Sequence, residues 1–125
     1  MTYAYTRIAE LTGVIHECQA RSNTVWLANC RESLTDIMRE HAPSGSGIDS
    51  GTQFIESEST DEKLVFQTAF HHMDDNGFYC GWSHHKVIAR PSFVFGYSLR
   101  ITGPNTRDIK DYLMDVFTHF LETEV

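Results

Sequence analysis

The chain has 125 residues, of which 41% are hydrophobic and 12% aromatic, and its formal net charge is −7. This composition excludes a disordered chain and predicts a single domain, residues 1–125, with one hydrophobic core. The negative charge argues against direct binding to the phosphates of DNA or RNA. The negative charge is compatible with a basic protein partner. The alternative is that it merely keeps a small protein soluble.

We expect neither a membrane-spanning segment nor a secretory signal in this chain. No apolar run reaches membrane-spanning length, and residues 1–5 lack the basic start and apolar core of a secretory signal. The three cysteines, Cys18, Cys30 and Cys80, form no Cys-x-x-Cys pair, which argues against a structural zinc site or a disulfide framework. We therefore expect a cytoplasmic protein with reduced thiols and no membrane partner.

Two amphipathic helices are expected at the start, over residues 3–19 and 24–41. Apolar residues recur at three- and four-residue spacing in both segments. Asn23 or Ser22 can cap the second helix by accepting a bond from a free backbone N–H, and Pro43 stops it. The expected apolar stripes are Ala4, Ile8, Leu11, Ile15 and Cys18 in the first helix, and Trp26 or Leu27, Cys30, Leu34, Ile37, Met38 and His41 in the second.

A glycine- and serine-rich stretch follows at residues 42–52 and precedes a short expected strand at 53–56. Its successive backbone N–H groups could form an anion-binding nest, with Ser44, Ser46 and Asp49 as candidate binding residues. No Gly-Lys-Ser/Thr sequence is present, so the stretch is not a P-loop. The alternative is a plain connector between a helix and a strand.

The central feature is a long hairpin with strands expected at residues 63–72 and 78–90. Asn76-Gly77 lies between the two runs, and this pair favours a type I′ turn, in which both central residues adopt positive φ. A longer loop that starts at Asp74 is the alternative.

A two-residue turn decides which side chains share a face of the hairpin. It places His71 opposite Trp82, and His84 then lies diagonally from His71, about 7–8 Å away on the more polar face. A slip of one residue would exchange the two faces. The face expected to cover the core carries Leu64, Phe66, Thr68, Phe70, His72, Ser83, His85, Val87 and Ala89.

A third long strand follows the hairpin. Pro91 is expected to end the second hairpin strand, and residues 92–102 alternate apolar and polar side chains, with the aromatic ones toward the core. Arg90 and Arg100 fall on the opposite, outer face and form a small cationic patch, to which Lys86 is a further candidate.

The element order is helix, helix, four strands, helix, and the last helix is the strongly amphipathic segment 106–122. The predicted fold class is α+β: two N-terminal helices, an antiparallel sheet of three to four strands with a long central hairpin, and a C-terminal helix packed on one sheet face. The outer face, with Trp82, His71, His84 and Val94, is a candidate surface for pairing with a second subunit, so a homodimer is expected.

One hypothesis for the hairpin is a metal or catalytic site. His71 and His84 could supply two zinc ligands and Asp74 or Asp75 a third, as in a small metal-dependent hydrolase. Cys80 close to a histidine could form a thiolate–imidazole pair. However, the sequence has neither a His-Glu-x-x-His helix nor a recognised nucleophile elbow. We therefore assign no catalytic residue and favour a protein that is not an enzyme.

The second hypothesis is a binding module. Side chains of several chemical kinds around a hairpin tip make an adaptable surface, and aromatic residues dominate interface hot spots. The candidate contact residues on the hairpin are His71, Asp74, Asp75, Tyr79, Trp82 and His84. The third hypothesis is structural: the histidines are polar strand residues, and the aspartates and Asn76-Gly77 simply make the turn.

Several phrases resemble small proteins encoded by phages, prophages and plasmids, a family with no established activity. The resemblance rests on Pro43–Thr52, Phe70–Met73, Gly77–Tyr79, Gly81-Trp82, His84 and Ile109–Leu113. It implies an accessory protein of a mobile element in a bacterial cytoplasm. Small acidic proteins of that kind often inhibit host defence, anti-CRISPR proteins among them. The resemblance therefore implies an inhibitor that binds a host protein or a small ligand such as a nucleotide signal, and it carries over no catalytic residue.

Overall fold

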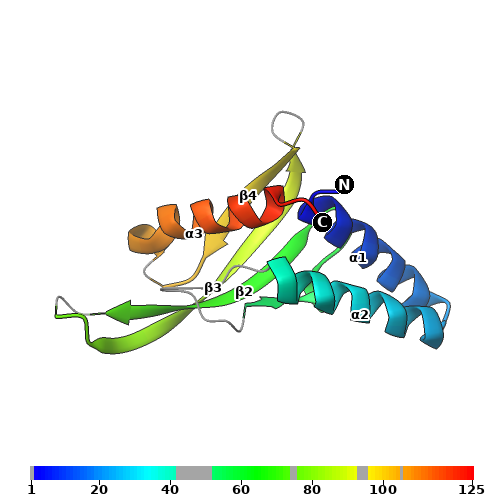
Figure 1. Ribbon diagram of the computed structural model, residues 1–125, viewed down its shortest axis with the longest axis horizontal. Helices are drawn as coiled ribbons and strands as arrows, with labels where there is room; N and C mark the ends of the chain where they lie inside the picture. The colour runs from blue at the N-terminus through cyan, green and yellow to red at the C-terminus, as the bar shows by residue number, and fades with distance from the viewer. Residues whose placement is uncertain (1, 42–51, 74–75, 93–95, 105) are drawn as a thin grey trace.

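The computed structural model describes residues 2–41, 52–73, 76–92, 96–104 and 106–125, with the side chains at positions 41, 71–73, 79–80 and 106–108 outside the description. Its elements, in chain order, are α1 (Ala4–Ala20), α2 (Thr24–His41), β1 (Gln53–Phe54), the short 3-10 helix η1 (Glu56–Glu58), β2 (Leu64–Met73), β3 (Tyr79–Ser92), β4 (Gly96–Thr102) and α3 (Thr106–Glu122) (Figure 1). The predicted α+β class and the predicted order of helices and strands are confirmed.

The four strands form one antiparallel sheet in the order β1-β2-β3-β4. The pairing of β2 with β3 runs from Leu64↔Ala89 to His72↔Gly81 without a shift, and it places His71 opposite Trp82. The predicted register of the hairpin is therefore confirmed over most of its length. Each connection joins neighbouring strands, as expected for an antiparallel sheet with short connections.

The tip of the hairpin differs from the prediction. The register shifts after His72, so that Met73 pairs with Tyr79 and Cys80 becomes an extra residue in β3. Gly81, next to this bulge, has a φ of +121°, a backbone conformation that glycine adopts at low cost. The prediction of a two-residue turn at Asn76-Gly77 is therefore wrong. The strands are joined through residues 74–78, which is close to the longer loop considered as the alternative.

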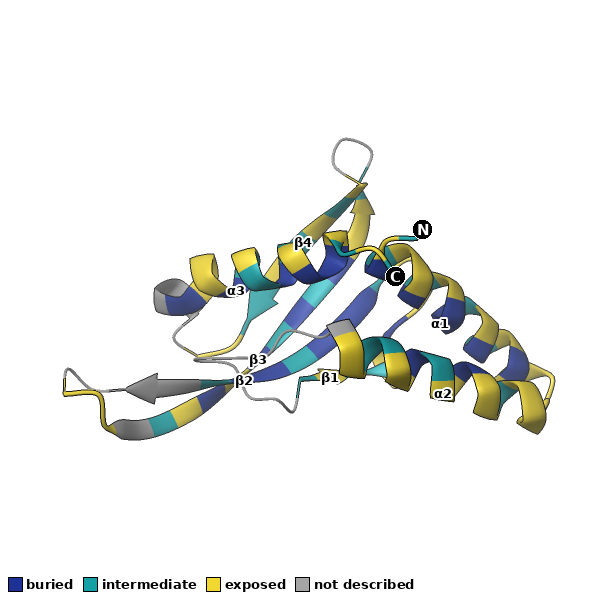
Figure 2. Cartoon of the chain, in the orientation of Figure 1, coloured by how far each residue is buried: buried dark blue, intermediate teal, exposed yellow. Residues whose placement is uncertain are grey.

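All three helices pack on one face of the sheet, and the core lies between them (Figure 2). Phe66 of β2 lies at its centre, with its ring 5.6 Å from that of Phe117 and 5.7 Å from that of Phe120. The fully or nearly buried apolar residues of the core are Ala4, Ile8, Leu11, Ile15, Cys30, Leu34, Leu64, Phe66, Val87, Ala89, Ile109, Leu113, Phe117, Phe120 and Leu121. The predicted stripe of the last helix thus faces the sheet.

The two N-terminal helices follow the predicted stripes, with one choice resolved. The side chain of Trp26 is 60% exposed, whereas Leu27 is half-buried against the core. Leu27 is therefore the member of the α2 stripe. Asn23 caps α2, because its Oδ1 accepts the backbone N–H of Trp26 at 3.3 Å.

Three strand boundaries differ from the prediction. One is the start of the last strand, predicted at residue 92: β4 begins at Gly96, and Ser92 belongs to β3. The first strand is shorter, Gln53–Phe54, since Glu56 already begins η1. Pro91 does not end β3, which continues to Ser92 and pairs Pro91 with Tyr97. The ladder between β2 and β3 begins at the pair Leu64↔Ala89, so Pro91 of β3 lies beyond the end of β2. A residue without an N–H therefore costs no ladder bond on that side.

The two ends of the described chain lie side by side (Figure 1). Tyr3 and Glu124 form an antiparallel bridge, and the backbone N–H of Ala4 donates to the carbonyl of Thr123 at 2.8 Å. These contacts bring the start of α1 against the end of α3. Among the described helices, none has the length and hydropathy needed to cross a membrane.

Candidate functional site

The face of the sheet opposite the helices, here called the outer face, carries most of the sequence-predicted site. Directly paired residues point to the same side of a sheet, so the register defines this face. Its members are Gln53, Val65, Gln67, Ala69, Trp82, His84, Lys86, Ile88, Arg90, Ser98, Arg100 and Thr102. Val65 and Ala69 are buried, whereas Trp82, His84, Arg90 and Arg100 are exposed.

The outer face continues onto an arm formed by β2 and β3 beyond the other strands. The β1 ladder reaches only to Gln67 of β2, and the β4 ladder begins only at Lys86 of β3. Among the described strands, residues 68–73 and 79–85 therefore pair only with each other; we call this segment the hairpin arm (Figure 1). A two-stranded hairpin in water is marginally stable by itself.

A contact with α3 supports the base of the hairpin arm. The ring of Phe70 meets that of Tyr112 edge-on, with the centroids 5.6 Å apart. Farther out, the side chains of Phe78 and Trp82 are 70% and 50% exposed. The arm therefore presents large aromatic side chains to solvent, which is the composition of interface hot spots.

Trp82 and His84 form the best-defined pair of the predicted site. They are alternate residues of β3, so both side chains lie on the outer face, and their rings lie 5.3 Å apart at an angle of 48°. Both side chains are exposed. A flat aromatic surface beside a histidine can contact an apolar or a hydrogen-bonding group of a partner.

The predicted cationic patch is confirmed. Arg90 and Arg100 are exposed on the outer face, where they occupy diagonal positions across β3 and β4. Lys86 also lies on this face, and its Nζ contacts the Glu58 carboxylate of η1 at 2.8 and 3.1 Å. The outer face of this acidic protein is thus locally cationic.

The opposite face of the hairpin is buried, as predicted. His85 is 1% exposed, and its Nε2 lies 2.6 Å from the Oγ of Ser83, so these two atoms are hydrogen-bonded to each other in the core. A Cβ at Gly103, at the end of β4, would lie 2.6 Å from the His85 ring. His85 is therefore a packed core residue at this position of the fold.

The other predicted site residues are only partly described. His71 lies in β2 at the predicted place, whereas Tyr79 of β3 pairs with Met73, one residue away from the predicted register. The side chains of both residues are outside the description. The remaining candidates, Ser44, Ser46, Asp49, Asp74 and Asp75, all lie outside the described residues. The structure thus brings Trp82 and His84 together and leaves the loop candidates as predictions.

The register gives the metal hypothesis one geometric basis. Because His71 pairs with Trp82 and Ala69 with His84, the two histidine positions are diagonal neighbours on the outer face, as predicted. Within the part of the chain that the structure describes, no three His, Cys, Asp or Glu side chains converge as metal ligands. The His71 side chain and both aspartates lie outside that part of the chain.

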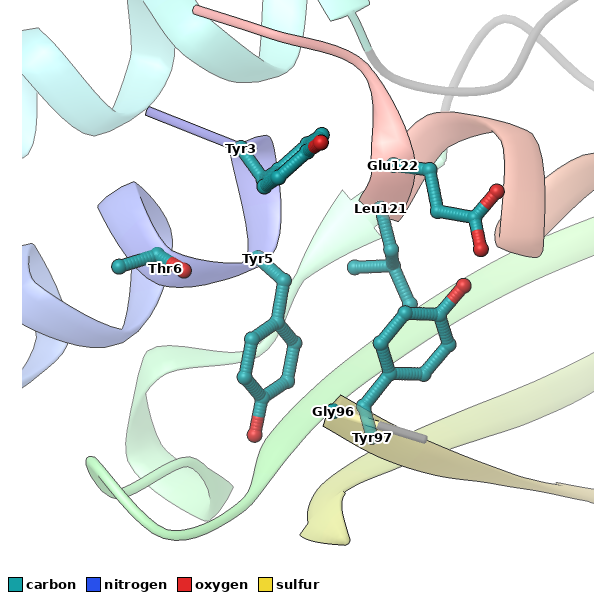
Figure 3. Close-up of a pocket in the computed structure, with 7 residues that line it drawn as sticks. All are labelled: Tyr3, Tyr5, Thr6, Gly96, Tyr97, Leu121 and Glu122. Atoms are coloured by element: carbon teal, nitrogen blue, oxygen red, sulfur yellow. The ribbon is translucent and has the colours of Figure 1, made fainter. Parts of the chain in front are cut away.

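Sequence reasoning missed a pocket of about 510 Å³ where the chain ends meet (Figure 3). Its walls include Tyr3, Tyr5, Tyr97 and Glu122, which come from α1, β4 and α3. No local pattern predicts such a site, since its parts lie some ninety residues apart in the sequence. The pair of tyrosines in Tyr3-Ala4-Tyr5, neither of which belongs to the apolar stripe of the helix, was the only hint.

No family model matches the chain, and no curated protein or solved structure matches it either.

Proposed function

We propose that this protein acts by binding, and that a partner protein with an acidic patch docks on the outer face and the hairpin arm. The observation that carries the proposal is the exposure of Trp82, beside His84, on a sheet face that α1, α2 and α3 leave uncovered. Tryptophan, tyrosine and arginine dominate the energetics of protein interfaces. The outer face offers a tryptophan on the hairpin arm and, roughly 20–26 Å farther along β3, two exposed arginines.

Charge favours an acidic protein surface as the occupant. Arg90 and Arg100 occupy diagonal positions, about 7–8 Å apart at the backbone, which suits two carboxylates of one acidic segment. A second copy of this chain would set one cationic face against another, which is unfavourable. A nucleic acid is also less favoured, because Lys86 is already paired with Glu58 and two arginines fall short of the roughly 6–10 phosphate contacts of typical binders.

The finer part of the proposal concerns the setting. We propose that the partner is a bacterial host protein and that binding inhibits it, as anti-defence proteins of mobile elements do. The support for this part is the resemblance of the hairpin and loop phrases to phage- and plasmid-encoded proteins, which is an analogy of context. The proposed mechanism is steric: an inhibitor that covers a functional surface of its target needs no catalytic group.

Capture from a bacterial lysate tests the docking surface when it is combined with two matched tryptophan variants. Trp26 of α2 is as exposed as Trp82 but belongs to another side of the molecule. We expect a partner that the wild-type chain and Trp26→Ala retain equally and that Trp82→Ala retains at least about tenfold less. Retention that is equal for all three proteins would overturn the proposed surface.

Two further readouts separate the other occupants. Light scattering of the pure protein reports the oligomeric state, and a dimer that Trp82→Ala dissociates would assign the outer face to a second copy. Capture that disappears after nuclease treatment would assign it to a nucleic acid. Either result would replace the acidic protein partner in the proposal.

The alternative function is a small metal-dependent hydrolase that uses His71 and His84, with zinc as the metal. One observation favours it, namely the confirmed diagonal placement of these two positions. Native mass spectrometry of protein purified without a histidine tag, with and without a chelator, tests it. One zinc per chain that is lost with the chelator and with His84→Ala would support a metal site. A mass without metal that does not change when zinc is added would exclude the metal-dependent hydrolase as the function.

A further inference from the structure

A second concave site lies at the end of the sheet remote from the hairpin tip. Its lining residues come from the first turn of α1, the start of β4 and the last turn of α3 (Figure 3). The cavity of about 510 Å³ is within the usual range for sites that hold small molecules or single side chains. The proposed docking surface does not use it, since the outer face lies on the other side of the sheet.

Three of the seven residues that line the pocket are tyrosines. Tyr5 and Tyr97 stack with centroids 5.6 Å apart at an angle of 26°, and Tyr3 stands at the rim with 54% of its surface exposed. Figure 3 shows the ring of Tyr3 and the hydroxyl of Tyr97 on the side of the pocket where Glu122 lies. The faces of aromatic rings carry partial negative charge, so this wall attracts cations.

Glu122 adds a full negative charge to the same wall. Its side chain is exposed, and none of the ion pairs among the described residues involves it. Burial raises the pKa of Tyr97, and the neighbouring Glu122 charge raises it further. The Tyr97 hydroxyl donates to the carbonyl of Thr118 at 3.2 Å. Figure 3 shows the Glu122 carboxylate on the side of the Tyr97 hydroxyl, and no described cation neutralises this carboxylate.

The two helix ends next to the pocket carry partial charges of opposite sign. Glu122 is the last residue of α3, where the partial negative charge of a helix favours a cation. The start of α1 has the opposite polarity, but the N–H of Ala4 is already bonded to the carbonyl of Thr123. The carboxylate carries a full charge, whereas the start of α1 carries only about half of one, so the net field of these groups is negative.

We propose that this pocket binds the alkylammonium group of a singly charged ligand, supplied either by a free small amine or by a lysine-type side chain. The three tyrosines would contact the methyl or methylene groups around the nitrogen, and Glu122 would neutralise its charge. A single carboxylate suits a single positive charge. The volume exceeds that of an ammonium ion alone, so an attached alkyl chain would fill the rest.

Choline and its neutral isostere, in which a carbon atom replaces the nitrogen, test the sign of the charge directly. Titration of the full chain, followed by the backbone amide NMR signals of Tyr3 to Thr6 and of Glu122, reports binding at the pocket. We expect saturable shifts with choline and an affinity for the isostere that is at least about fivefold weaker. Equal affinities, or no saturable shift with choline, would overturn the proposal.

Three variants distinguish a loss of binding from a loss of folding. Glu122→Gln changes an exposed side chain and should weaken choline binding by about three- to tenfold. Glu32→Gln, an exposed position on α2, should leave it unchanged, and Tyr97→Phe should retain most of it because the ring remains. Equal binding by Glu122→Gln and wild type would contradict the role of the carboxylate.

A peptide that contains trimethyllysine distinguishes the two sources of the ammonium group. Binding much tighter than that of choline would indicate a protein side chain, and equal binding would indicate a free amine; both agree with the proposal. Trp82→Ala should leave choline binding unchanged. Failure of this proposal would therefore be seen separately from failure of the docking surface.

Discussion

Gly103 is the residue at which the fold tolerates a side chain least. Its φ is +126°, and a Cβ built there would lie 2.6 Å from Nδ1 of His85 and 2.7 Å from the carbonyl oxygen of His84. The second of these atoms belongs to the backbone of β3, so it cannot move aside at low cost. Gly77, by contrast, has a φ of +81° with no described atom within 4 Å of such a Cβ.

The two glycines allow the backbone strain and the clash to be separated. Gly77→Ala should lower the free energy of unfolding by about 1 kcal/mol, from strain alone. Gly103→Ala should lower it by more than about 2 kcal/mol, because the clash with β3 is added. Urea unfolding followed by circular dichroism measures both. Equal losses would mean that the close approach of Gly103 to His85 is absent.

Tyr5 gives the protein a pH dependence on the alkaline side. Burial raises the pKa of its phenol above the ordinary 10.0. The folded state therefore holds this proton more tightly than the unfolded state, and the corresponding stability is present below pH 10 and is lost as the pH rises above it. The Tyr5 hydroxyl has no hydrogen-bond partner among the described residues, so removing it should not weaken the fold at neutral pH.

Tyr5→Phe should therefore make the stability less sensitive to alkali. We expect a smaller fall in the free energy of unfolding between about pH 9 and about pH 11 than in the wild type. Tyr3→Phe is the matched control, because it removes the hydroxyl of a tyrosine that is more than half exposed. Urea unfolding at several pH values measures the effect, and identical profiles for Tyr5→Phe and wild type would refute it.

Among the elements, the most periodic segments were predictable. The α3 stripe and the hairpin register follow from repeated apolar spacing, since a shift of one residue would turn a whole apolar face to solvent. The hairpin tip and the end of β3 were not predictable in the same way. The bulge at Cys80 and the continuation through Pro91 depend on where the neighbouring strands stop, and this is a property of the sheet as a whole.

The contrast between the core and the hairpin arm predicts two different costs for the same substitution. Phe117 of α3 is 0% exposed and packs on Phe66, so Phe117→Ala should lower the free energy of unfolding by about 3–5 kcal/mol. Phe78→Ala, at the exposed end of the arm, should change it by less than about 1 kcal/mol. Thermal unfolding compares them, and a large loss at Phe78 would mean that the arm is part of the core.

The ion pair between Glu58 and Lys86 tests the charge of the outer face. Both side chains are about half exposed, so the pair itself contributes at most about 1 kcal/mol to stability. Glu58→Gln frees the Lys86 charge, and we expect an acidic partner to bind about two- to fivefold more tightly at low salt, with the gain fading as salt is added. Titration calorimetry with the captured partner measures this gain.

A matched control exists on α1. Glu10 forms a similar exposed ion pair with Arg7, away from the outer face. Glu10→Gln should leave the affinity for the partner unchanged. If both substitutions strengthened binding equally, the effect would reflect net charge alone, and the outer face would not be the docking surface.

At the scale of the whole molecule, the fold separates two kinds of surface. The helices cover one side of the sheet, and the acidic residues that give the net charge of −7 are mostly on helices and turns. The outer face is locally cationic and carries Trp82. The composition predicted only that this chain presents an acidic surface to its partners. The strand register shows that basic side chains gather on the outer face.

The pocket between the chain ends illustrates the limit of sequence reasoning in this protein. Tyr5 and Tyr97 stack at 5.6 Å although ninety-two positions separate them, and the bridge between Tyr3 and Glu124 joins the first helix to the end of the last. Such contacts depend on how the elements pack together. Periodicity within one element carries no information about them.

The most direct measurement of the central claim uses the fluorescence of the two tryptophans separately. The chain has two, so Trp26→Phe leaves Trp82 as the single tryptophan and Trp82→Phe leaves Trp26. We expect the captured partner to shift the Trp82 emission to the blue and to protect it from acrylamide quenching, with Trp26 unaffected. Protection of Trp26 while Trp82 stays accessible would contradict docking on the outer face.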